Sequence, residues 1–429
     1  MDWREVLGAK LVTPEEAVSV VRSGTVIACS LTEPSELCAA LAQREDVSDV
    51  TVISAVLLPG GASLAGKDRF RVITGFATPV SYPLLRQGAI EYIPLPFSQA
   101  HRWLERDFHP DAVMVRLTPP DGQGLCSYGW TAGFTPELVR FAEARSLPLL
   151  AEIDPSMPYT VSPHQVSVES ITGAIEASAP PAGGDAPSVA SEHAGAIAVY
   201  LSDLVPDGAT LQVGIGSVPD IAASLLVDKK DLGIHTEVLN EGLIDLMERG
   251  VATGARKSLH PGKAVCTICA MSKKIHAFVD RNPDVLVMSS AEALDPRVVA
   301  QNRLLRCVNS AFQVDLLGQV NAETLGGFQV AGVGGQLDFL RGAALADDAA
   351  AIIVLDSTTS DGRVSRIVPE LGRGTVVTST RYDVDYVVTE NGIAQMRGKT
   401  TRERARALIG VAHPNFRDDL ERVASELAL

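Results

Sequence analysis

The sequence lacks long hydrophobic runs, and no stretch approaches the ~20 consecutive apolar residues that span a bilayer. Its first residues, Met-Asp-Trp-Arg-Glu, carry no apolar segment of the kind found in secretory signals. Positive charge is also in deficit, because 37 Lys and Arg face 52 Asp and Glu, which gives a net charge of −15. This balance disfavours nucleic acid and anionic membranes as partners. It leaves room for an anionic small ligand, which needs only a local patch or helix N-termini.

Cysteine is scarce and scattered. The six cysteines are Cys29, Cys38, Cys126, Cys266, Cys269 and Cys307. This distribution predicts reduced thiols in a cytoplasmic protein rather than a disulfide framework. The single C-x-x-C, Cys266-Thr-Ile-Cys269, has no second pair and no His at metal spacing, so a buried strand is favoured over zinc and we expect no metal site.

Two common catalytic motifs are missing. Gly398-Lys-Thr400 lacks the upstream glycine of a P-loop, and no G-x-S-x-G nucleophile elbow occurs. These absences remove the simplest evidence for a nucleotide triphosphatase or a serine hydrolase.

Short apolar strands alternate with helical patterns along both halves of the chain. A length of 429 residues favours more than one domain, and 46% hydrophobic residues with 21% charged residues are typical of a soluble globular protein. We therefore expect an α/β protein of two similar open α/β/α domains with mostly parallel sheets. Strands are expected at 25–29, 50–54, 90–94, 112–116, 148–153, 209–213, 233–236, 285–288, 351–355, 375–378 and 386–388. Helices are expected at 13–22, 37–44, 136–145, 191–204, 220–227, 400–410 and 416–427, with another after Glu237 that includes Leu239, Leu243 and Leu246.

Residues 173–190 change character, because glycine, proline and other small residues crowd a stretch with little periodicity. This composition predicts a linker between two domains. We expect an N-terminal domain at 1–178, a linker at 179–190 and a C-terminal domain at 191–429.

Glu237 follows the expected strand at 233–236 and lies about twenty residues after a glycine turn, Gly214-Ile-Gly216. A carboxylate at the carboxyl end of a strand, near such a turn, lies where open α/β sheets bind ligands. Position alone favours a simpler interpretation, a negative charge near the N-terminus of the next helix. The turn itself is a broken dinucleotide fingerprint, because Pro219 stands at its last position. It is either a tight βα turn or a cradle of N–H groups for an oxyanion or phosphate.

A second glycine-rich stretch runs from Ala331 to Asp338 and contains Gly332, Gly334 and Gly335. It exceeds what a turn needs, which indicates close approach of the backbone to a ligand. His235 and His260 have no partner His at helical spacing, so we interpret them as structural or as polar lining.

A series of short motifs runs in order along nearly the whole chain. They are Thr118–Gly124, Ala151–Pro158, Gln212–Gly216, Leu232–Glu237, Leu259–Lys263, Met271–Ile275, Phe278–Asp280, Val308–Ser310, Val320–Glu323, Gly334–Phe339, Arg341–Ala343, Val388–Glu390 and Ala412–Pro414. Together they resemble the acetyl-CoA hydrolase/transferase family, above all its branch of 4-hydroxybutyrate CoA-transferase and related acetate or butyrate CoA-transferases.

This resemblance implies two similar α/β domains with the active site between them. It also implies a CoA-transferase that moves CoA between a short-chain acyl-CoA and a carboxylic acid such as acetate. The glutamate matching Glu237 would be the nucleophile, forming an acyl-glutamyl anhydride and then a glutamyl-CoA thioester. The alternative is an acyl-CoA hydrolase that uses the same glutamate. A non-catalytic CoA-binding module and a sugar-phosphate isomerase-like activity are further alternatives.

The resemblance also implies binding residues and partners. Backbone N–H groups at Ile215 and Gly335 would stabilise the oxyanion. Residues near CoA would be Gly214, Ile215, Gly216, Ser217, Val218, Asn309, Gly332, Gly334, Gly335 and Glu390. Coenzyme A would be a co-substrate, with no tightly bound cofactor, and the family suggests a homodimer or a higher homo-oligomer.

The sequence departs from the family pattern at four places. Tyr159 replaces a common Arg, Val238–Glu241 replaces Met-Phe-Ser-Asp, Leu345–Asp348 replaces Ser-x-Gly-Gly, and Asn391 replaces an aromatic residue. These changes bear on the acyl pocket or its surroundings, and so on the substrate more than on the chemistry.

Overall fold

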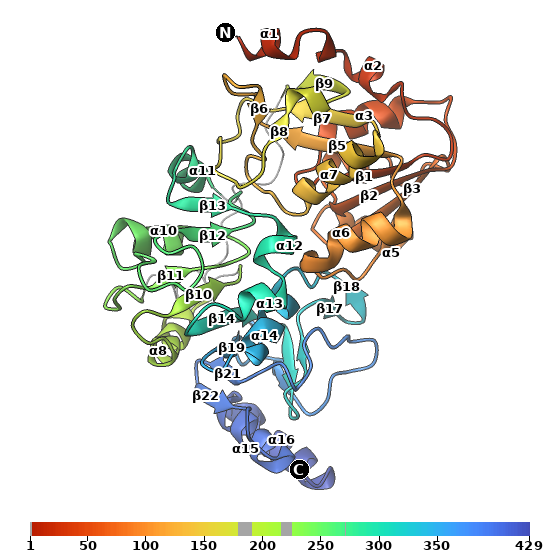
Figure 1. Cartoon of the computed structure of the whole chain (residues 1–429). Coiled ribbons are helices and arrows are strands. Elements are labelled where there is room, and N and C mark those ends of the chain that lie inside the picture. Colours follow the sequence, from red (N-terminus) through yellow and green to blue (C-terminus); the bar gives the residue numbers. More distant parts are fainter. Residues whose placement is uncertain (1, 179–190, 216–224, 271) are drawn as a thin grey trace. The chain divides into compact units, whose positions relative to one another are not determined.

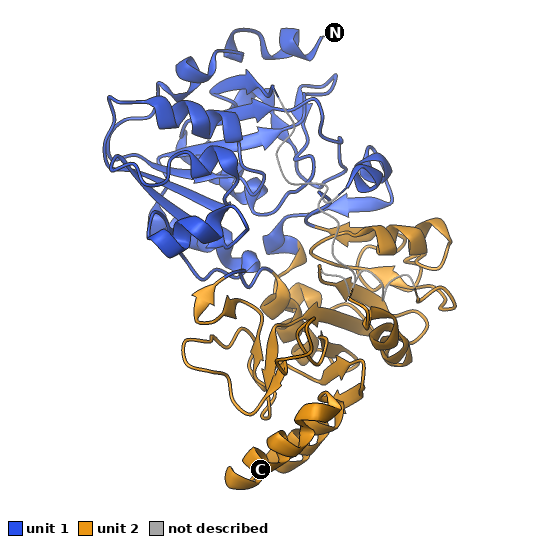
Figure 2. Cartoon of the chain, turned by 180° about the vertical axis from the view of Figure 1, so that it is seen from behind, with its two compact units in different colours: residues 1–185, 267–292, 330–334 blue, residues 186–266, 293–329, 335–429 orange. Residues whose placement is uncertain are grey.

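The computed structural model describes residues 2–178, 191–215, 225–270 and 272–429. The chain divides into two compact units (Figure 2). Unit 1 comprises residues 1–185, 267–292 and 330–334, and unit 2 comprises residues 186–266, 293–329 and 335–429. The expected linker at 179–190 lies outside the described residues. The later chain returns to unit 1 twice, a feature that the expected division into two continuous domains did not include.

Unit 1 contains a seven-stranded sheet in which every neighbouring pair is parallel (Figure 1). In spatial order its strands are β4 (Glu91–Tyr92), β3 (Phe70–Phe76), β2 (Val50–Val56), β1 (Val26–Cys29), β5 (Ala112–Leu117), β7 (Leu149–Ile153) and β9 (Gly173–Glu176). Central strands such as β5 are buried along their whole length, as expected when helices cover both faces of a parallel sheet.

Side-chain caps begin the helices α1, α2 and α11 of unit 1. Thr13 and Glu16 form a reciprocal capping box at α2 (Pro14–Val18), with Pro14 in the first turn. The other helices are α1 (Trp3–Leu7), α3 (Ser35–Gln43), α4 (Pro59–Ala62), α5 (Ser81–Gln87), α6 (Ala100–Trp103), α7 (Thr135–Arg145) and α11 (Lys273–Val279). Unit 1 also contains β6 (Leu125–Cys126), which pairs with β8 (Val166–Ser167), and β13 (Val285–Val287). Helix α12 (Ser290–Ala293) spans the change from unit 1 to unit 2.

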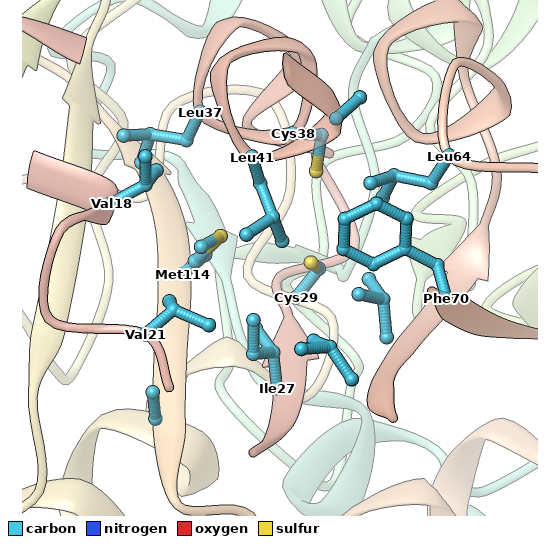
Figure 3. Packing of buried hydrophobic residues seen from close by; sticks show 14 of the residues in the cluster. Val18, Val21, Ile27, Cys29, Leu37, Cys38, Leu41, Leu64, Phe70 and Met114 are labelled. Carbon is cyan, nitrogen blue, oxygen red and sulfur yellow. The ribbon is translucent and has the colours of Figure 1, made fainter. Parts of the chain in front are cut away.

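The core of unit 1 forms where β1 packs against α3 (Figure 3). Ile27 and Cys29 from the strand lie beneath Leu37, Cys38 and Leu41 from the helix, and all five side chains are fully buried. Each buried aliphatic side chain of this size contributes about 1.5–3 kcal/mol through removal of its surface from water. This packing fixes the loop that follows β1 at the carboxyl edge of the sheet.

Unit 2 contains a six-stranded sheet in the order β11 (Gly233–Ile234), β10 (Thr210–Val213), β14 (Leu305–Ser310), β19 (Ala350–Val354), β21 (Tyr386–Thr389) and β22 (Gly392–Gln395). The first five strands run parallel, and β22 is antiparallel to β21. Their carboxyl ends therefore meet at one edge of the sheet.

Within the described residues, the helices of unit 2 are α8 (Ala194–Leu204), α10 (Glu241–Glu248), α13 (Pro296–Val299), α14 (Gln336–Leu345), α15 (Thr401–Val411) and α16 (Pro414–Glu426). Helix α8 packs its buried face, which includes Ile197 and Leu201, against Ile352, Val354 and Val388 of the sheet. The remaining strands are β12 (Ala264–Cys266), the small sheet of β16 (Val320–Asn321), β15 (Gln313–Asp315) and β20 (Ile367–Val368), and the hairpin of β17 (Thr324–Leu325) and β18 (Phe328–Gln329).

The expected α/β class with mostly parallel sheets is confirmed, but several elements differ. Residues 173–176, grouped with the linker by composition, form β9, because small residues suit an edge strand that packs closely on the N-terminal segment. The strand expected at 375–378 is wrong, since this stretch is an irregular segment joined to Val320 and Thr324 by isolated hydrogen bonds. Helix α2 ends at Val18, four residues earlier than expected. Most of the helix expected at 220–227 lies outside the described residues.

All six cysteines lie in the described ranges, where each is buried and forms no disulfide. Across those ranges no helix is long and apolar enough to cross a membrane. The same ranges contain no cluster of three or more His, Cys, Asp or Glu side chains arranged to hold a metal ion.

Candidate active site

The carboxyl ends of β10, β11 and β14 define the candidate active site in unit 2. Strand β10 lies between the other two and runs parallel to both. The chain passes from β10 to β11 on one side and later to β14 on the other, so the strand order reverses here. Such a reversal opens a crevice at the carboxyl edge of an α/β sheet, where ligands bind.

Glu237 lies three residues beyond the end of β11, and its half-buried carboxylate contacts the second glycine stretch. Its Oε2 accepts a hydrogen bond from the backbone N–H of Gly335, with 2.9 Å between the heavy atoms. Gly335 is the N-cap of α14, so the carboxylate also lies at the N-terminus of a ten-residue helix. The sequence separates these two residues by almost a hundred positions, and the fold brings them into contact.

Burial controls the ionisation of Glu237. Removal from water raises the pKa of this carboxyl to about 7, and the nearby Asp338 on α14 raises it as well, while the hydrogen bond from Gly335 lowers it. A carboxyl with a pKa near neutrality can exist at physiological pH either as an anion, which can attack an electrophile, or as an acid. The side chain that caps α10 is that of Asn240 and not that of Glu237.

Gly335 is required for space rather than for backbone freedom. Its φ of −95° is open to any residue, but a Cβ atom there would lie 2.7 Å from Glu237 Oε2 and 3.2 Å from Leu294 Cδ1. A side chain would therefore push the carboxylate away from the amide that holds it.

The first glycine turn follows β10 directly. The N–H of Gly214 donates to the carbonyl of Val308 at 2.8 Å, and a Cβ at Gly214 would lie 3.3 Å from Asn309 Oδ1. Ile215 is 48% exposed, and its carbonyl accepts a hydrogen bond from Ser310 Oγ at 3.2 Å. Two hydrogen bonds thus join the turn to β14, one through the N–H of Gly214 and one through the carbonyl of Ile215. Gly216, Ser217 and Val218, which we expected to bind CoA, lie outside the described residues.

Asn309 lies beneath the first glycine turn and pairs with Gln212 of β10. Asn309 Nδ2 donates to Gln212 Oε1 at 2.9 Å, and Gln212 Nε2 donates to Asn309 Oδ1 at 3.2 Å. Both side chains are buried, so each amide satisfies the other. The pair locks β10 to β14 at the point where the strand order reverses.

Glu390 belongs to a different cluster, at the end of β21. Its carboxylate accepts hydrogen bonds from the Ser357 N–H at 3.0 Å and from the Ser357 hydroxyl, and Asn391 Nδ2 donates to it at 3.2 Å. Asn391 also donates to Ser357 Oγ, so Ser357, Glu390 and Asn391 form one hydrogen-bonded group beyond the ends of β19 and β21. These hydrogen bonds do not join Glu390 to Glu237 or Asn309.

Gly332 and Gly334, which we expected near CoA, belong to unit 1. A Cβ at Gly332 would lie 2.6 Å from Phe76 Cδ2 and 2.9 Å from the carbonyl oxygen of Gly75. The carbonyl of Gly334 accepts a hydrogen bond from the Phe97 N–H at 3.2 Å. Within unit 1, Gly332 thus lies close against the end of β3, and residues from Gly335 onward belong to unit 2.

Two buried polar residues lie beside β11: His235, which the sequence led us to interpret as structural or as polar lining, and Lys257, which it did not indicate. His235 Nε2 lies 2.7 Å from the carbonyl oxygen of Ala293, and Lys257 Nζ lies 2.7 Å from that of Ile234 and 2.6 Å from that of Lys263. Burial lowers the pKa of Lys257 to about 7 and that of His235 to about 4. Gly233 leaves the space that the Lys257 side chain fills, since a Cβ atom at 233 would lie 2.3 Å from Lys257 Cγ.

The departures at Tyr159 and Leu345 have different surroundings. Tyr159 lies in unit 1, where its hydroxyl donates to Asp121 Oδ2 at 3.0 Å and its ring carries the Arg281 guanidinium 4.5 Å from the centroid. Leu345 ends α14 and is 64% exposed, so no packing explains this replacement.

Comparison with known proteins identifies the family. Residues 272–424 match the model of the acetyl-CoA hydrolase/transferase C-terminal domain. The chain is 38% identical over 432 residues to the 4-hydroxybutyrate coenzyme A transferase of Clostridium kluyveri, with 98% of each chain covered. The chain belongs to the acetyl-CoA hydrolase/transferase family.

Two further comparisons extend the likeness over the whole chain. A butyryl-CoA:acetate CoA-transferase of Anaerostipes caccae is 31% identical, with 98% of this chain and 97% of the relative covered. The crystal structure of RipA from Yersinia pestis superimposes with a TM-score of 0.92 at 33% identity and covers all of both chains. The family expected from the ordered motifs is therefore confirmed.

Proposed function

We propose that this protein is a CoA-transferase that moves CoA from a short-chain acyl-CoA to a carboxylic acid, with Glu237 as the nucleophile. The observation that carries the proposal is the contact between the Glu237 carboxylate and the Gly335 amide, together with a pKa near 7. The names of the full-length relatives, which are CoA transferases, support the reaction class.

The first half-reaction begins with attack of a Glu237 carboxylate oxygen on the thioester carbonyl carbon. The C–S bond breaks, the CoA thiolate leaves, and an acyl-glutamyl anhydride forms. The thiolate then attacks the glutamyl carbonyl of the anhydride, which expels the acyl group as a free carboxylate and leaves a glutamyl-CoA thioester. Covalent catalysis of this kind divides one hard exchange into easier steps.

The second half-reaction reverses this chemistry with the acceptor. The acceptor carboxylate attacks the glutamyl-CoA thioester and expels the thiolate, which gives a second anhydride. The thiolate attacks the acyl carbonyl of that anhydride, so the new acyl-CoA forms and the Glu237 carboxylate is restored. Binding of the remote CoA moiety can help to drive the strained acyl steps.

Each tetrahedral intermediate carries an oxyanion that needs donors. The Gly335 N–H points at the reacting carboxyl group, and the backbone at Ile215 follows β10 at the neighbouring strand end. When Glu237 gives up its negative charge by forming a covalent bond, the Gly335 amide is released for the oxyanion. A donor that is already in place can stabilise the oxyanion without any reorganisation of solvent.

A covalent adduct tests the proposal directly. Incubation with an acyl-CoA alone, without an acceptor, should give a CoA adduct that peptide mass spectrometry places on Glu237. Glu237→Ala should abolish both the adduct and CoA transfer. Glu421→Ala, on the exposed face of α16, is the matched control and should keep both. Full transferase activity in Glu237→Ala would refute the mechanism.

Hydrolysis by the same glutamate is the second candidate, and the family model covers hydrolases as well as transferases. Water would attack the anhydride or the glutamyl-CoA thioester in place of the acceptor. Release of free CoA should be measured with and without acetate. A rate of CoA release that does not depend on the acceptor would favour the hydrolase.

A further inference from the structure

His235 lies two residues before Glu237 and is 1% exposed. Its Nε2 is 2.7 Å from the carbonyl oxygen of Ala293. A carbonyl accepts hydrogen bonds and cannot donate them, so the proton of the neutral ring lies on Nε2. The ring is therefore a donor with a fixed direction.

The surroundings of the ring keep it neutral. The pKa of His235 is lowered to about 4, mainly by burial and to a smaller extent by the charges of Lys257 and His260, while the hydrogen bond to Ala293 raises it. Its Nδ1 is buried and has no hydrogen-bond partner within the described ranges. With no accessible nitrogen and no charge near neutral pH, His235 is unsuited to general acid or base catalysis.

The same ring contacts the helix that provides the Gly335 amide. Its edge meets Phe339 of α14, with 6.3 Å between the ring centroids and 77° between the planes. Its backbone is bridged to Val265, whose carbonyl accepts the Thr236 N–H at 2.9 Å. His235, in the segment that leads from β11 to Glu237, thus contacts both the backbone at Ala293 and the first turn of α14.

We propose that His235 is a positioning residue that ties the segment carrying Glu237 to the backbone at Ala293. This inference rests on the proposed function, since it concerns the placement of the proposed nucleophile. Without the bond to Ala293, the segment would lose its register with α14, and the carboxylate would move away from the Gly335 amide. Misplacement of a reacting group by about 1 Å is enough to cost on the order of 100-fold in rate.

Two amide variants keep a polar side chain at position 235 but place its hydrogen-bond donor at different points. In His235→Gln the side-chain NH₂ reaches the place of Nε2, so the bond to Ala293 can form. In His235→Asn the shorter amide reaches only the place of Nδ1, where there is no partner. We expect kcat of the Gln variant within about threefold of the wild type, and kcat of the Asn variant lower by roughly 10- to 100-fold with KM for acyl-CoA unchanged.

The pH profile gives a readout that a merely structural role would not change. The Gly335 hydrogen bond lowers the pKa of Glu237, while burial and Asp338 raise it. Weakening that bond in His235→Asn should move the acidic midpoint of kcat/KM to higher pH, and His235→Gln should leave it in place. His413→Asn is the control, because His413 caps α16 through its side chain and asparagine caps helices as well.

The outcomes distinguish this inference from the proposed function. Equal losses in the Gln and Asn variants, or an Asn variant with an unshifted midpoint, would overturn the positioning role even if Glu237→Ala is inactive. Activity retained in Glu237→Ala would instead overturn the proposed function. Thermal melting of each variant, compared with the wild type, tells whether a loss of kcat comes from a loss of fold.

Discussion

The backbone N–H of Gly335 holds Oε2 of Glu237 at 2.9 Å, across 98 residues of sequence. The surroundings act on the pKa of the Glu237 carboxyl in opposite directions. The Gly335 amide lowers this pKa, burial and Asp338 raise it, and the result is a pKa of about 7. A weak nucleophile gains reactivity from desolvation, and the amide keeps its attacking oxygen in one direction.

The rate of the first half-reaction should therefore depend on pH near neutrality. Attack requires the carboxylate, and a pKa of about 7 means that this form is lost as the pH falls through 7. We expect kcat/KM for acyl-CoA to fall about tenfold for each pH unit below 6 and to level off above 8. The measurement is the initial rate of adduct formation between pH 5 and 9. A midpoint near the ordinary value of 4.5 would contradict the role of burial.

Glu237→Gln should stabilise the fold at alkaline pH while it abolishes activity. The folded-state pKa of Glu237 lies above the ordinary value of 4.5, so the folded chain binds this proton more tightly than the unfolded chain does. The stability that comes from this site is complete below pH 4.5 and is lost as the pH rises through 7. Glutamine keeps an acceptor for Gly335 and has no charge to bury.

We expect Tm of the Gln variant to exceed that of the wild type by ~1–4 °C at pH 8.5 and to approach it near pH 4.5. Differential scanning calorimetry at both pH values checks the sign. A Tm difference that is the same at both pH values would show that charge burial is not its cause.

Gly335→Ala should remove most activity without unfolding the chain. The added methyl group would lie 2.7 Å from Glu237 Oε2, and the carboxylate would have to leave the amide. We expect kcat to fall at least ~100-fold, the usual effect of losing one donor to an oxyanion. Gly195→Ala in α8 is the control, because its Cβ meets no atom within 4 Å, and alanine there should be neutral or slightly stabilising. Wild-type rates in Gly335→Ala would refute the assigned contact.

The reciprocal amide pair of Gln212 and Asn309 should show strong coupling. Asn309→Leu leaves a buried amide on Gln212 without its partner, which costs about 1–3 kcal/mol of stability. Gln212→Leu should cost a similar amount, and the double variant should cost less than the sum of the two. A double-mutant cycle from chemical unfolding measures this term, and additive losses would show that the two amides act independently.

Much of the fold could be predicted from local pattern. Thr13, Pro14 and Glu16 predict the start of α2, and buried apolar runs predict β5, β7 and β19, because these signals act over a few residues. Strands β3 and β14 were not predicted. Their segments, Phe70–Phe76 and Leu305–Ser310, contain polar residues that interrupt the apolar pattern and are buried in the folded sheet. Asn309 is one of them, and Gln212 satisfies it.

The sequence names candidate residues for the site, and their roles stay predictions, but it does not give their contacts. Glu237, Gly214 and Gly335 came from the motifs, but nothing local to 237 indicates that its amide donor lies at 335. The roles expected for Asn309 and Glu390 at CoA stay predictions, as do the cytoplasmic location and the homodimer or higher assembly. His235 and Lys257 looked unremarkable, because a buried polar side chain is recognised only when its partners are known.

The setting of Glu237 has a consequence for folding. Thr236 bonds to Val265, His235 to Ala293 and Glu237 to Gly335. Val265 lies shortly before the chain enters unit 1 at residue 267, and Ala293 and Gly335 are the first residues after it leaves unit 1 again. The nucleophile's surroundings are therefore completed only when residues about one hundred positions later have been synthesised. Because such long-range contacts form slowly, the catalytic geometry should be among the last parts of unit 2 to mature, after its local helices and hairpin.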